Sequence, residues 1–298
     1  MKKAGSVAYY IVDVFTNKSY SGNPLAVVFT NGNLELNQYV DIAREFGYSE
    51  TSFVFYAVEQ KALSVRSFTP TGFEVHGAGH NLLGAVAAAL LNEIEIFKDQ
   101  GADSFVIMKG AKILVSVSTD NITRLPIVKM KQRSAVIGKT VPPELIADAL
   151  GLPGSGVIFQ NLVPTIVTTE VAHIMVPVTD SNTLDNIKTD NKKLIALSRQ
   201  YEFEGFYCFA FTEGNAHIVE ARFFNPLIGI DEDAATGTAA GPLAGFLVSN
   251  SLVKPNTAYK ILQGVKLNQP SAIEVMVRDN DILVGGGSVI TMKGEIYL

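Results

Sequence analysis

Cysteine is almost absent from this chain of 298 residues, and its one cysteine, Cys208, cannot form an internal disulfide. Cys208 lies within the apolar run 206–211, which predicts a buried side chain that acts as a small hydrophobe. A chain without disulfides fits a reducing compartment. No small-residue cleavage site follows the N-terminal apolar stretch, so a signal peptide is not predicted. We therefore expect a cytoplasmic protein.

Basic residues are scarce as well. The chain has 24 Lys and Arg against 29 Asp and Glu, a net charge of −5, and no basic cluster beyond short pairs such as Lys192-Lys193. Nucleic-acid binding is not expected, because it depends on a concentrated positive surface. The chain also lacks an apolar run of the roughly 20 residues that a membrane-spanning helix needs. We expect neither a nucleic-acid partner nor a membrane.

Nucleotide and metal motifs are missing too. Gly77-Ala78-Gly79 has no third glycine at the spacing of the dinucleotide fingerprint, and no Walker motif occurs. His76 and His80 are four positions apart, but glycines intervene and no His-Glu-x-x-His pattern is present. We therefore expect no cofactor and no metal.

The chain does contain many apolar segments, and 47% of its residues are hydrophobic. Helical spacing predicts helices over residues 36–46 and 142–150, each followed by a capping glycine, and a helix within residues 184–201. Apolar alternation and short apolar runs predict strands at residues 7–15, 25–30, 53–58, 63–68, 105–108, 112–117, 127–131, 163–168, 172–178, 206–212 and 216–224.

One turn and helix stand out from the rest of the chain. The turn Gly77-Ala78-Gly79-His80-Asn81 leads into residues 82–91, which are apolar on every side. A surface helix would show a polar stripe, so this helix is predicted to be buried all round. Its N-terminus then presents backbone N–H groups and a positive dipole end inside the protein, which suits an anion.

The second half of the chain repeats this arrangement. Arg66-Ser67-Phe68-Thr69-Pro70 is echoed by Arg222-Phe223-Phe224-Asn225-Pro226, and each segment leads to an apolar helix that opens near Gly79 or Gly237. The repeat predicts two similar domains, each with a sheet around a central apolar helix. We expect domains at residues 1–125 and 126–286, with a strand at about 287–298 returning to the first, and a carboxylate-binding cleft between them.

Three ionisable side chains lie near the glycine turns: Glu50, His80 and Asp233. Taken singly, each has a simpler structural interpretation. Glu50 can be a strand-end carboxylate that accepts a local hydrogen bond, His80 a capping or core histidine, and Asp233 a complement to the helix dipole. The three therefore become candidates only when they are considered together.

Several segments form a recognisable pattern around these residues. They are Asp13-Val14-Phe15-Thr16, Gly22-Asn23-Pro24-Leu25-Ala26-Val27, Ala43-Arg44-Glu45-Phe46-Gly47-Tyr48-Ser49-Glu50-Thr51, Phe68-Thr69-Pro70, Ala78-Gly79-His80, Glu232-Asp233-Ala234-Ala235-Thr236-Gly237-Thr238-Ala239-Ala240-Gly241-Pro242-Leu243-Ala244, Ile261-Leu262-Gln263-Gly264 and Gly285-Gly286-Gly287. From about Asp13 to the C-terminus the chain resembles the PhzF family of phenazine-biosynthesis-like isomerases.

The resemblance implies a diaminopimelate-epimerase-like α+β fold of two pseudo-symmetric domains, each a mainly antiparallel sheet around a central apolar helix. It also implies a cofactor-free isomerase that acts on a small cyclic carboxylic acid, dihydro-hydroxyanthranilate. In this family the glutamate matching Glu50 moves a proton between carbons, which requires its pKa to be lifted toward neutrality by burial. His80 and Asp233 would hold the substrate and share in proton relay. The further substrate contacts that the resemblance implies are Asn23, Ser49, Gly79, Gly237 and Thr238.

Two departures limit the resemblance. Epimerases of the wider superfamily use one cysteine from each domain, whereas neither glycine turn here carries a thiol, so a two-cysteine racemase mechanism is excluded. Where the family usually has a Glu-Leu-Pro-like step, this chain has Glu74-Val75-His76, which leaves the substrate open.

We predict a PhzF-type isomerase with catalytic Glu50, His80 and Asp233, and the resemblance implies a homodimer. The alternative is a non-catalytic small-molecule-binding or metabolic-damage protein that uses the same cleft.

Overall fold

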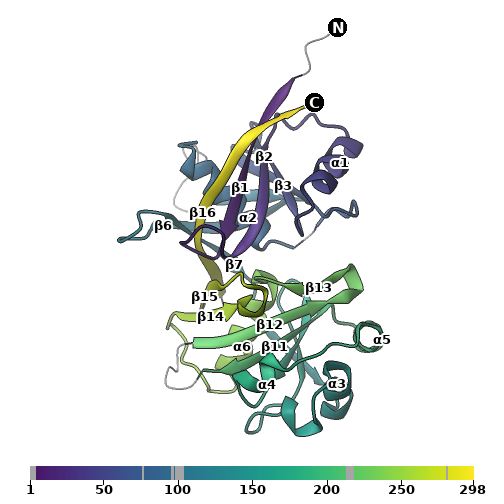
Figure 1. Cartoon of the computed structure of the whole chain (residues 1–298). Coiled ribbons are helices and arrows are strands. Elements are labelled where there is room, and N and C mark those ends of the chain that lie inside the picture. The colour runs from purple at the N-terminus through teal and green to yellow at the C-terminus, as the bar shows by residue number, and fades with distance from the viewer. Residues whose placement is uncertain (1–4, 76, 95–96, 98–103, 213–217, 280) are drawn as a thin grey trace. The chain divides into compact units, whose positions relative to one another are not determined.

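The computed structural model describes residues 5–75, 77–94, 97, 104–212, 218–279 and 281–298. The chain forms two compact units (Figure 1). Unit 1 comprises Met1–Lys131 and Gly285–Leu298, and unit 2 comprises Gln132–Val284. Each unit combines helices with a sheet, so the predicted α+β class is confirmed.

Unit 1 is built on strands whose order closes on itself. Neighbours follow the order β1-β2-β3-β4-β5-β6-β7-β16, and β16 also pairs with β1. Figure 1 shows β16 running beside β1. The strands are β1 (Ser6–Val14), β2 (Asn23–Phe29), β3 (Thr51–Ala57), β4 (Ala62–Phe68), β5 (Phe105–Met108), β6 (Ala111–Thr119), β7 (Pro126–Gln132) and β16 (Asp281–Tyr297), whose first residues belong to unit 2.

Two parallel pairs in this sheet are joined by helices. The pair β2–β3 is connected through α1 (Leu36–Phe46), and the pair β4–β5 through α2 (His80–Leu91). Parallel neighbours need such crossovers, whereas the pairs β1–β2, β3–β4 and β5–β6 are antiparallel and need only turns. The α2 crossover brings the start of that helix into the interior of unit 1.

Helix α2 is buried as the sequence predicted. Its residues 80–89 are all buried, and it packs against β1, β2, β3 and β4. Helix α1 instead covers the outer face of the sheet through its apolar side. There Tyr39 packs edge-on against Phe53, with ring centroids 4.7 Å apart, and stacks on Phe68 at 5.2 Å. Unit 1 therefore has apolar packing on both faces of β3 and β4.

Unit 2 repeats the order of pairings. Its strands neighbour each other as β15-β14-β12-β11-β10-β9-β8, with β13 on β12, and the pairs β10–β11 and β12–β14 are parallel. The strands are β8 (Val136–Thr140), β9 (Thr165–Thr168), β10 (Ala172–Pro177), β11 (Gly205–Phe211), β12 (Ile218–Asn225), β13 (Ile230–Asp233), β14 (Tyr259–Gln263) and β15 (Ser271–Arg278).

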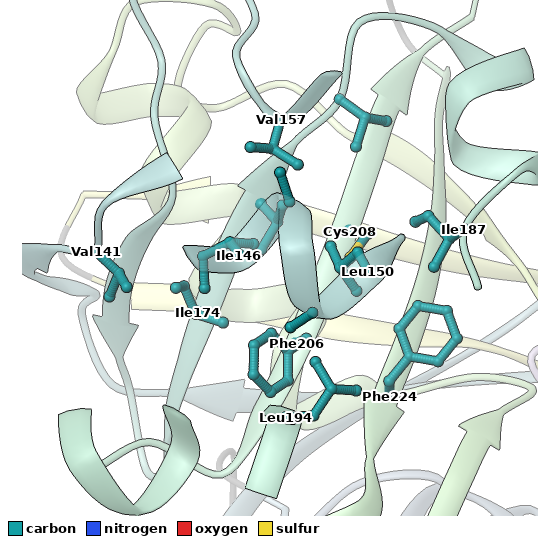
Figure 2. Packing of buried hydrophobic residues seen from close by; sticks show 14 of the residues in the cluster. Val141, Ile146, Leu150, Val157, Ile174, Ile187, Leu194, Phe206, Cys208 and Phe224 are labelled. Carbon is teal, nitrogen blue, oxygen red and sulfur yellow. The ribbon is translucent and has the colours of Figure 1, made fainter. Parts of the chain in front are cut away.

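The helices of unit 2 lie on two sides of its sheet. The helices are α3 (Pro143–Leu150), α4 (Ser181–Asp185), α5 (Asn191–Tyr201) and α6 (Gly237–Ser249), with short 3-10 turns at Gly154–Val157, Pro226–Ile228 and Val265–Leu267. Helices α3, α4 and α5 contribute to one apolar cluster, in which the predicted burial of Cys208 is confirmed (Figure 2). Burial raises the pKa of the Cys208 thiol, which keeps it protonated and unreactive.

The position of β11 explains why its sequence is continuously apolar, because both of its faces are buried. Phe206, Cys208 and Ala210 point into the cluster of Figure 2, whereas Phe209 on the opposite face packs against Phe246 of α6, with ring centroids 6.3 Å apart. A strand buried on both faces shows no polar alternation. Helix α6 thus packs against the sheet as α2 does in unit 1.

The helix predicted within residues 184–201 is confirmed as α5, and the segment also holds the end of α4. The strand predictions need correction. Strands β8, β13, β14 and β15 were not predicted, and the strand expected at about 287–298 begins at Asp281. In the part of the chain that the structure describes, no helix has the length and hydropathy to cross a bilayer.

Candidate active site

His80 is the first residue of α2 and lies inside unit 1, with 6% of its surface exposed. Burial lowers the pKa of its imidazole to about 4, and the positive end of the helix dipole acts in the same direction. Its Nε2 atom is buried and meets no hydrogen-bond partner among the described residues. The site therefore holds a neutral imidazole with one ring nitrogen still able to bond a ligand.

The turn before His80 is stabilised by the residue after it. The Gly79 N–H donates to Oδ1 of Asn81 over 2.7 Å, and the Leu82 N–H donates to the same oxygen over 2.8 Å. Gly79 was expected to offer its N–H to a substrate carboxylate, but this donor is engaged within the turn. The His80 and Asn81 N–H groups are the first-turn donors that lie beyond the reach of helical carbonyls.

Glu50 directly precedes β3 and is half-buried, and its Oε2 atom is shielded from solvent. Ser49 beside it is also half-buried. Asn23, 3% exposed, is the first residue of β2. Because β2 and β3 are parallel, with Ala26 opposite Thr51, Asn23 and Glu50 lie toward the same edge of the sheet. Unit 1 thus gathers Asn23, Ser49 and Glu50 at one strand edge.

Asp13 supports this edge from β1. It is 5% exposed, and its Oδ2 accepts the Tyr20 N–H over 2.6 Å in the loop that leads to Asn23. Burial raises the pKa of Asp13, while the backbone hydrogen bonds from Tyr20 and Ser21 lower it in part. Burial and the nearby Asp13 charge raise the pKa of Tyr48. Asp13 therefore orders the loop in front of β2.

The remaining predicted residues belong to unit 2. Asp233 ends β13, and its Oδ2 accepts the hydroxyl of Thr236 over 2.7 Å. Gln263, fully buried, fixes this segment: its Nε2 donates to the Asp233 carbonyl over 2.9 Å, and its Oε1 accepts the Tyr207 hydroxyl over 2.9 Å. Burial, and secondarily the Asp233 charge, raise the pKa of Tyr207, which keeps its hydroxyl as a donor.

Gly237 and Thr238 are the first two residues of α6, as the sequence predicted for the second apolar helix. Gly237 is buried and Thr238 half-buried. The Gly237 carbonyl accepts Nε2 of Gln132 over 3.0 Å, and Pro242 removes the helical donor for the Thr238 carbonyl. The Gly237 and Thr238 N–H groups are suited to an anion, because they lie before the reach of the helical carbonyls, whereas the Ala239 N–H donates to the Thr236 carbonyl over 3.2 Å.

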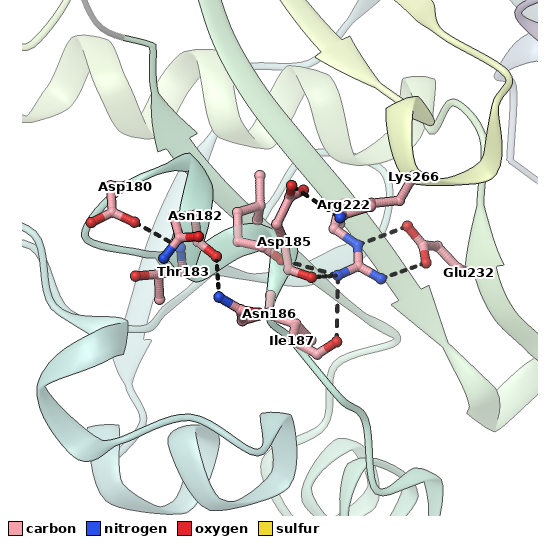
Figure 3. A network of polar contacts seen from close by, with 10 residues as sticks. Asp180, Asn182, Thr183, Asp185, Asn186, Ile187, Arg222, Glu232 and Lys266 are labelled. Atoms are coloured by element: carbon pink, nitrogen blue, oxygen red, sulfur yellow. Dashed lines mark hydrogen bonds and ion pairs between the residues drawn. The ribbon is translucent and has the colours of Figure 1, made fainter.

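Each unit contains an arginine–glutamate pair close in sequence to its candidate residues. Arg222 binds Glu232 through two hydrogen bonds, of 2.9 and 2.7 Å, and its Nη1 donates to the Leu184 carbonyl over 3.0 Å (Figure 3). Arg66 binds Glu74 in the same way, over 2.9 and 3.0 Å. Glu74, part of the sequence departure noted above, is thus engaged within unit 1, while His76 lies outside the described residues.

Sequence reasoning missed the supporting residues Asn81, Gln132 and Gln263. The available signal was weak: each is a polar residue inside or next to an apolar segment that folds into the interior. As for metal binding, the residues that the structure describes contain no group of three His, Cys, Asp or Glu side chains placed to hold an ion.

The fold of this chain matches several solved structures. A Bacillus anthracis phenazine biosynthesis protein of the PhzF family aligns with a TM-score of 0.88 at 21% identity, covering 99% of this chain and 100% of the other. A hydroxyproline epimerase from Agrobacterium vitis shares the fold more distantly, with a TM-score of 0.60 at 11% identity over 100% of this chain and 93% of the other. The fold class is therefore the α+β class that these two structures share.

Within that class, the chain belongs to the family of phenazine biosynthesis-like proteins, PhzC-PhzF, which it matches over residues 12–294. An uncharacterised isomerase of Clostridium acetobutylicum is 32% identical over 97% of both chains. The trans-2,3-dihydro-3-hydroxyanthranilate isomerase of Pseudomonas aeruginosa is 29% identical over 97% of this chain and 99% of the other. The family resemblance read from the sequence is confirmed.

Proposed function

We propose that the protein is a cofactor-independent isomerase that moves a proton on a small cyclic or amino carboxylic acid, of the dihydro-hydroxyanthranilate type. The observation that carries the proposal is the buried, neutral imidazole of His80, whose Nε2 lacks a partner among the described residues at the start of an apolar helix. A structural histidine in such a place is normally hydrogen-bonded, because an unsatisfied buried polar atom costs about 1–3 kcal/mol.

The proposed reaction needs one carboxylate and no oxidant. The ionised carboxylate of Glu50 accepts a proton from one carbon of the substrate, and the carboxylic acid so formed returns a proton to a different carbon. One C–H bond breaks and another forms, while the electron pairs of the substrate double bonds shift between them. The neutral imidazole of His80 can hydrogen-bond the substrate without carrying a full charge into the interior.

We assign Asp233 to substrate binding and proton relay in the same reaction, and Gly237 and Thr238 to backbone donors for the substrate carboxylate, with Asn23 and Ser49 as further contacts. Support comes from the way Thr236 and Gln263 hold the Asp233 segment and from the first-turn donors of α6. A substrate carboxylate would be stabilised there, since a helix N-terminus favours anions by roughly 0.3–1 kcal/mol even when exposed.

The test uses trans-2,3-dihydro-3-hydroxyanthranilate in deuterated water, with deuterium incorporation followed by NMR. The wild type should place deuterium on carbon, and Glu50→Gln should slow this by about a hundredfold or more, the usual contribution of a general base. Glu45→Gln is the matched control, because Glu45 is exposed on α1 close by in sequence. Exchange by Glu50→Gln at the wild-type rate would contradict the role of Glu50.

The same assay separates the alternative function. A ligand that binds with no solvent exchange into any tested cyclic amino acid would favour a non-catalytic small-molecule-binding protein. We further propose that the protein acts in the cytoplasm as a homodimer. Sedimentation of the purified chain would measure the oligomeric state directly.

A further inference from the structure

Asn81 makes hydrogen bonds with every polar group of its side chain, although it is only 1% exposed. Its Oδ1 accepts the N–H groups of Gly79 and Leu82, over 2.7 and 2.8 Å. Its Nδ2 donates to the carbonyl of Gly77 over 3.1 Å. One side chain thus joins both sides of His80, the loop before it and the helix after it.

Asn81 is needed because the helix has no ordinary cap. The residue at the N-cap position of α2 is Gly79, which has no side chain to accept a first-turn N–H. The Asn81 oxygen takes over that task for the Gly79 and Leu82 N–H groups. The Leu82 N–H also donates to the Gly79 carbonyl over 3.2 Å, whereas Asn81 Oδ1 is the acceptor of the Gly79 N–H. Leaving the Gly79 N–H without an acceptor in an interior that is otherwise apolar would cost about 1–3 kcal/mol.

The backbone of Asn81 is also tied to the strand that follows Glu50. Ser52 Oγ donates to the Asn81 carbonyl over 3.0 Å, and the same Oγ lies 2.8 Å from Oγ of Ser67. Ser52 and Ser67 face each other across β3 and β4, and both are fully buried. A chain of hydrogen bonds therefore runs from β4 through β3 into the start of α2.

This chain of bonds connects two proposed catalytic residues. Ser52 is two positions after Glu50 on the same strand, and Asn81 directly follows His80. Any shift of α2 along the sheet would have to break the contact between Ser52 and Asn81. Apolar packing alone resists sliding weakly, because it has no preferred direction, whereas a hydrogen bond requires a defined distance and angle.

We propose that Asn81, held by Ser52, is a positioning residue that sets the place of the His80 imidazole relative to Glu50. The catalytic consequence rests on the proposed isomerase function, whereas the structural consequence does not. Neither Asn81 nor Ser52 is proposed to touch the substrate.

The catalytic arm compares Asn81→Ala and Ser52→Ala with the wild type in the deuterium assay on trans-2,3-dihydro-3-hydroxyanthranilate. We expect kcat to fall about tenfold to a hundredfold while KM changes far less, because misplacement of a reacting group acts mainly on the chemical step. Asn92→Ala is the control: Asn92 caps the other end of α2 by donating to the Ala88 carbonyl over 2.7 Å, and its loss should leave kcat unchanged.

The structural arm works without turnover. Amide hydrogen exchange should show a protected Gly79 N–H in the wild type and in Ser52→Ala but an unprotected one in Asn81→Ala. The NMR signals of the His80 ring should shift in both variants and not in Asn92→Ala. A wild type that exchanges no substrate proton would count against the proposed function, and this arm would still decide the position of His80.

Three results would overturn the proposal: unchanged His80 ring signals in both variants, unchanged kcat in Ser52→Ala despite an active wild type, or an equal loss of kcat in Asn92→Ala. Should Asn81→Ala not fold, the test rests on Ser52→Ala. That variant removes only the bond to the Asn81 carbonyl and keeps the three side-chain bonds of Asn81, so the turn stays capped while its tie to β3 is lost.

Discussion

Arg222 and Glu232 form a two-bonded ion pair that Arg66 and Glu74 repeat in the other unit. Both arginines belong to the Arg-x-Phe-x-Pro segments, and both also lie over a phenylalanine two positions later, at 5.0 and 5.1 Å from the ring centroid. Glu74 lies five positions before Gly79, the N-cap of α2, and Glu232 lies five positions before Gly237, the first residue of α6. The duplicated pairs thus hold equivalent loops in front of α2 and α6.

The two pairs are expected to differ in strength because they differ in exposure. The side chains of Arg222 and Glu232 are each 13% exposed, against 33% and 22% for Arg66 and Glu74. Glu232→Ala should lower the free energy of unfolding by about 3 kcal/mol, since it leaves a largely buried guanidinium without a counter-charge. Glu74→Ala should cost about 1–2 kcal/mol, between the buried and the surface case.

Urea unfolding of both variants measures this difference. Asp41→Ala is the control, because Asp41 pairs with Arg44 on the surface with both side chains more than 60% exposed, and its loss should cost less than about 0.5 kcal/mol. Equal effects of Glu232→Ala and Asp41→Ala would show that the pair does not stabilise the fold.

The second prediction concerns the charge of His80. With its pKa lowered to about 4 by burial, the imidazole should remain neutral throughout the range in which a free histidine, with a pKa near 6.5, would gain its proton. NMR of the labelled ring measures this titration directly. A midpoint close to 6.5 would show that the ring is solvated, and the proposed role as an uncharged substrate contact would fail.

His173 gives the third prediction, and it concerns stability. Burial lowers its pKa to about 3, and its Nδ1 accepts the Gly205 N–H over 3.2 Å. Because the folded pKa lies below the unfolded one, the unfolded chain binds the proton more readily below pH 6.5, and stability falls as pH decreases toward 3. Between pH 7 and pH 5 the loss should be about 2 kcal/mol for this histidine, by linkage.

His173→Gln provides the comparison, since its amide oxygen can still accept the Gly205 N–H but does not titrate. The variant should lose about 2 kcal/mol less than the wild type between pH 7 and pH 5, measured by urea unfolding at both pH values. An identical pH dependence of the two proteins would mean that His173 is protonated equally in the folded and unfolded chain.

The sequence predicted those elements that local pattern defines. Helix α1 has the predicted bounds, and Gly47 after it adopts the left-handed conformation, φ 69°, that a capping glycine allows. Strand β8 was missed because all five of its residues are exposed and show no apolar alternation. The start of β16 was missed because glycines disfavour strands; Gly285 is required there, since a Cβ would lie 2.2 Å from the Val128 carbonyl.

The residues of the candidate site could be predicted from the sequence, but the hydrogen bonds that hold them in place could not. Glu50, His80 and Asp233 were identified through the family resemblance together with the glycine turns. That the Gly79 N–H is already bonded by Asn81, and that Gln263 holds Asp233, depend on contacts between side chains and backbone in three dimensions. No local periodicity encodes such contacts, so only the folded structure reveals them.

The last prediction concerns how closely α2 approaches the sheet. A Cβ on Gly84 would lie 2.7 Å from Cδ2 of Leu25 and 2.7 Å from Cγ2 of Val14, both of which are buried. In an open helix Gly→Ala would stabilise by about 1 kcal/mol. Here overpacking, which typically costs about 1–3 kcal/mol, should outweigh that gain, so Gly84→Ala should lower the free energy of unfolding.

A double-mutant cycle separates steric conflict from any other cause. Val14→Ala removes one of the two opposing methyl groups, so the Gly84→Ala/Val14→Ala variant should be less destabilised than the sum of the single changes, by about 0.5 kcal/mol or more. Gly154→Ala is the control, because its Cβ would meet nothing within 4 Å. Strict additivity would mean that α2 can move away from β1, and that the position of His80 at its start is not fixed by this packing.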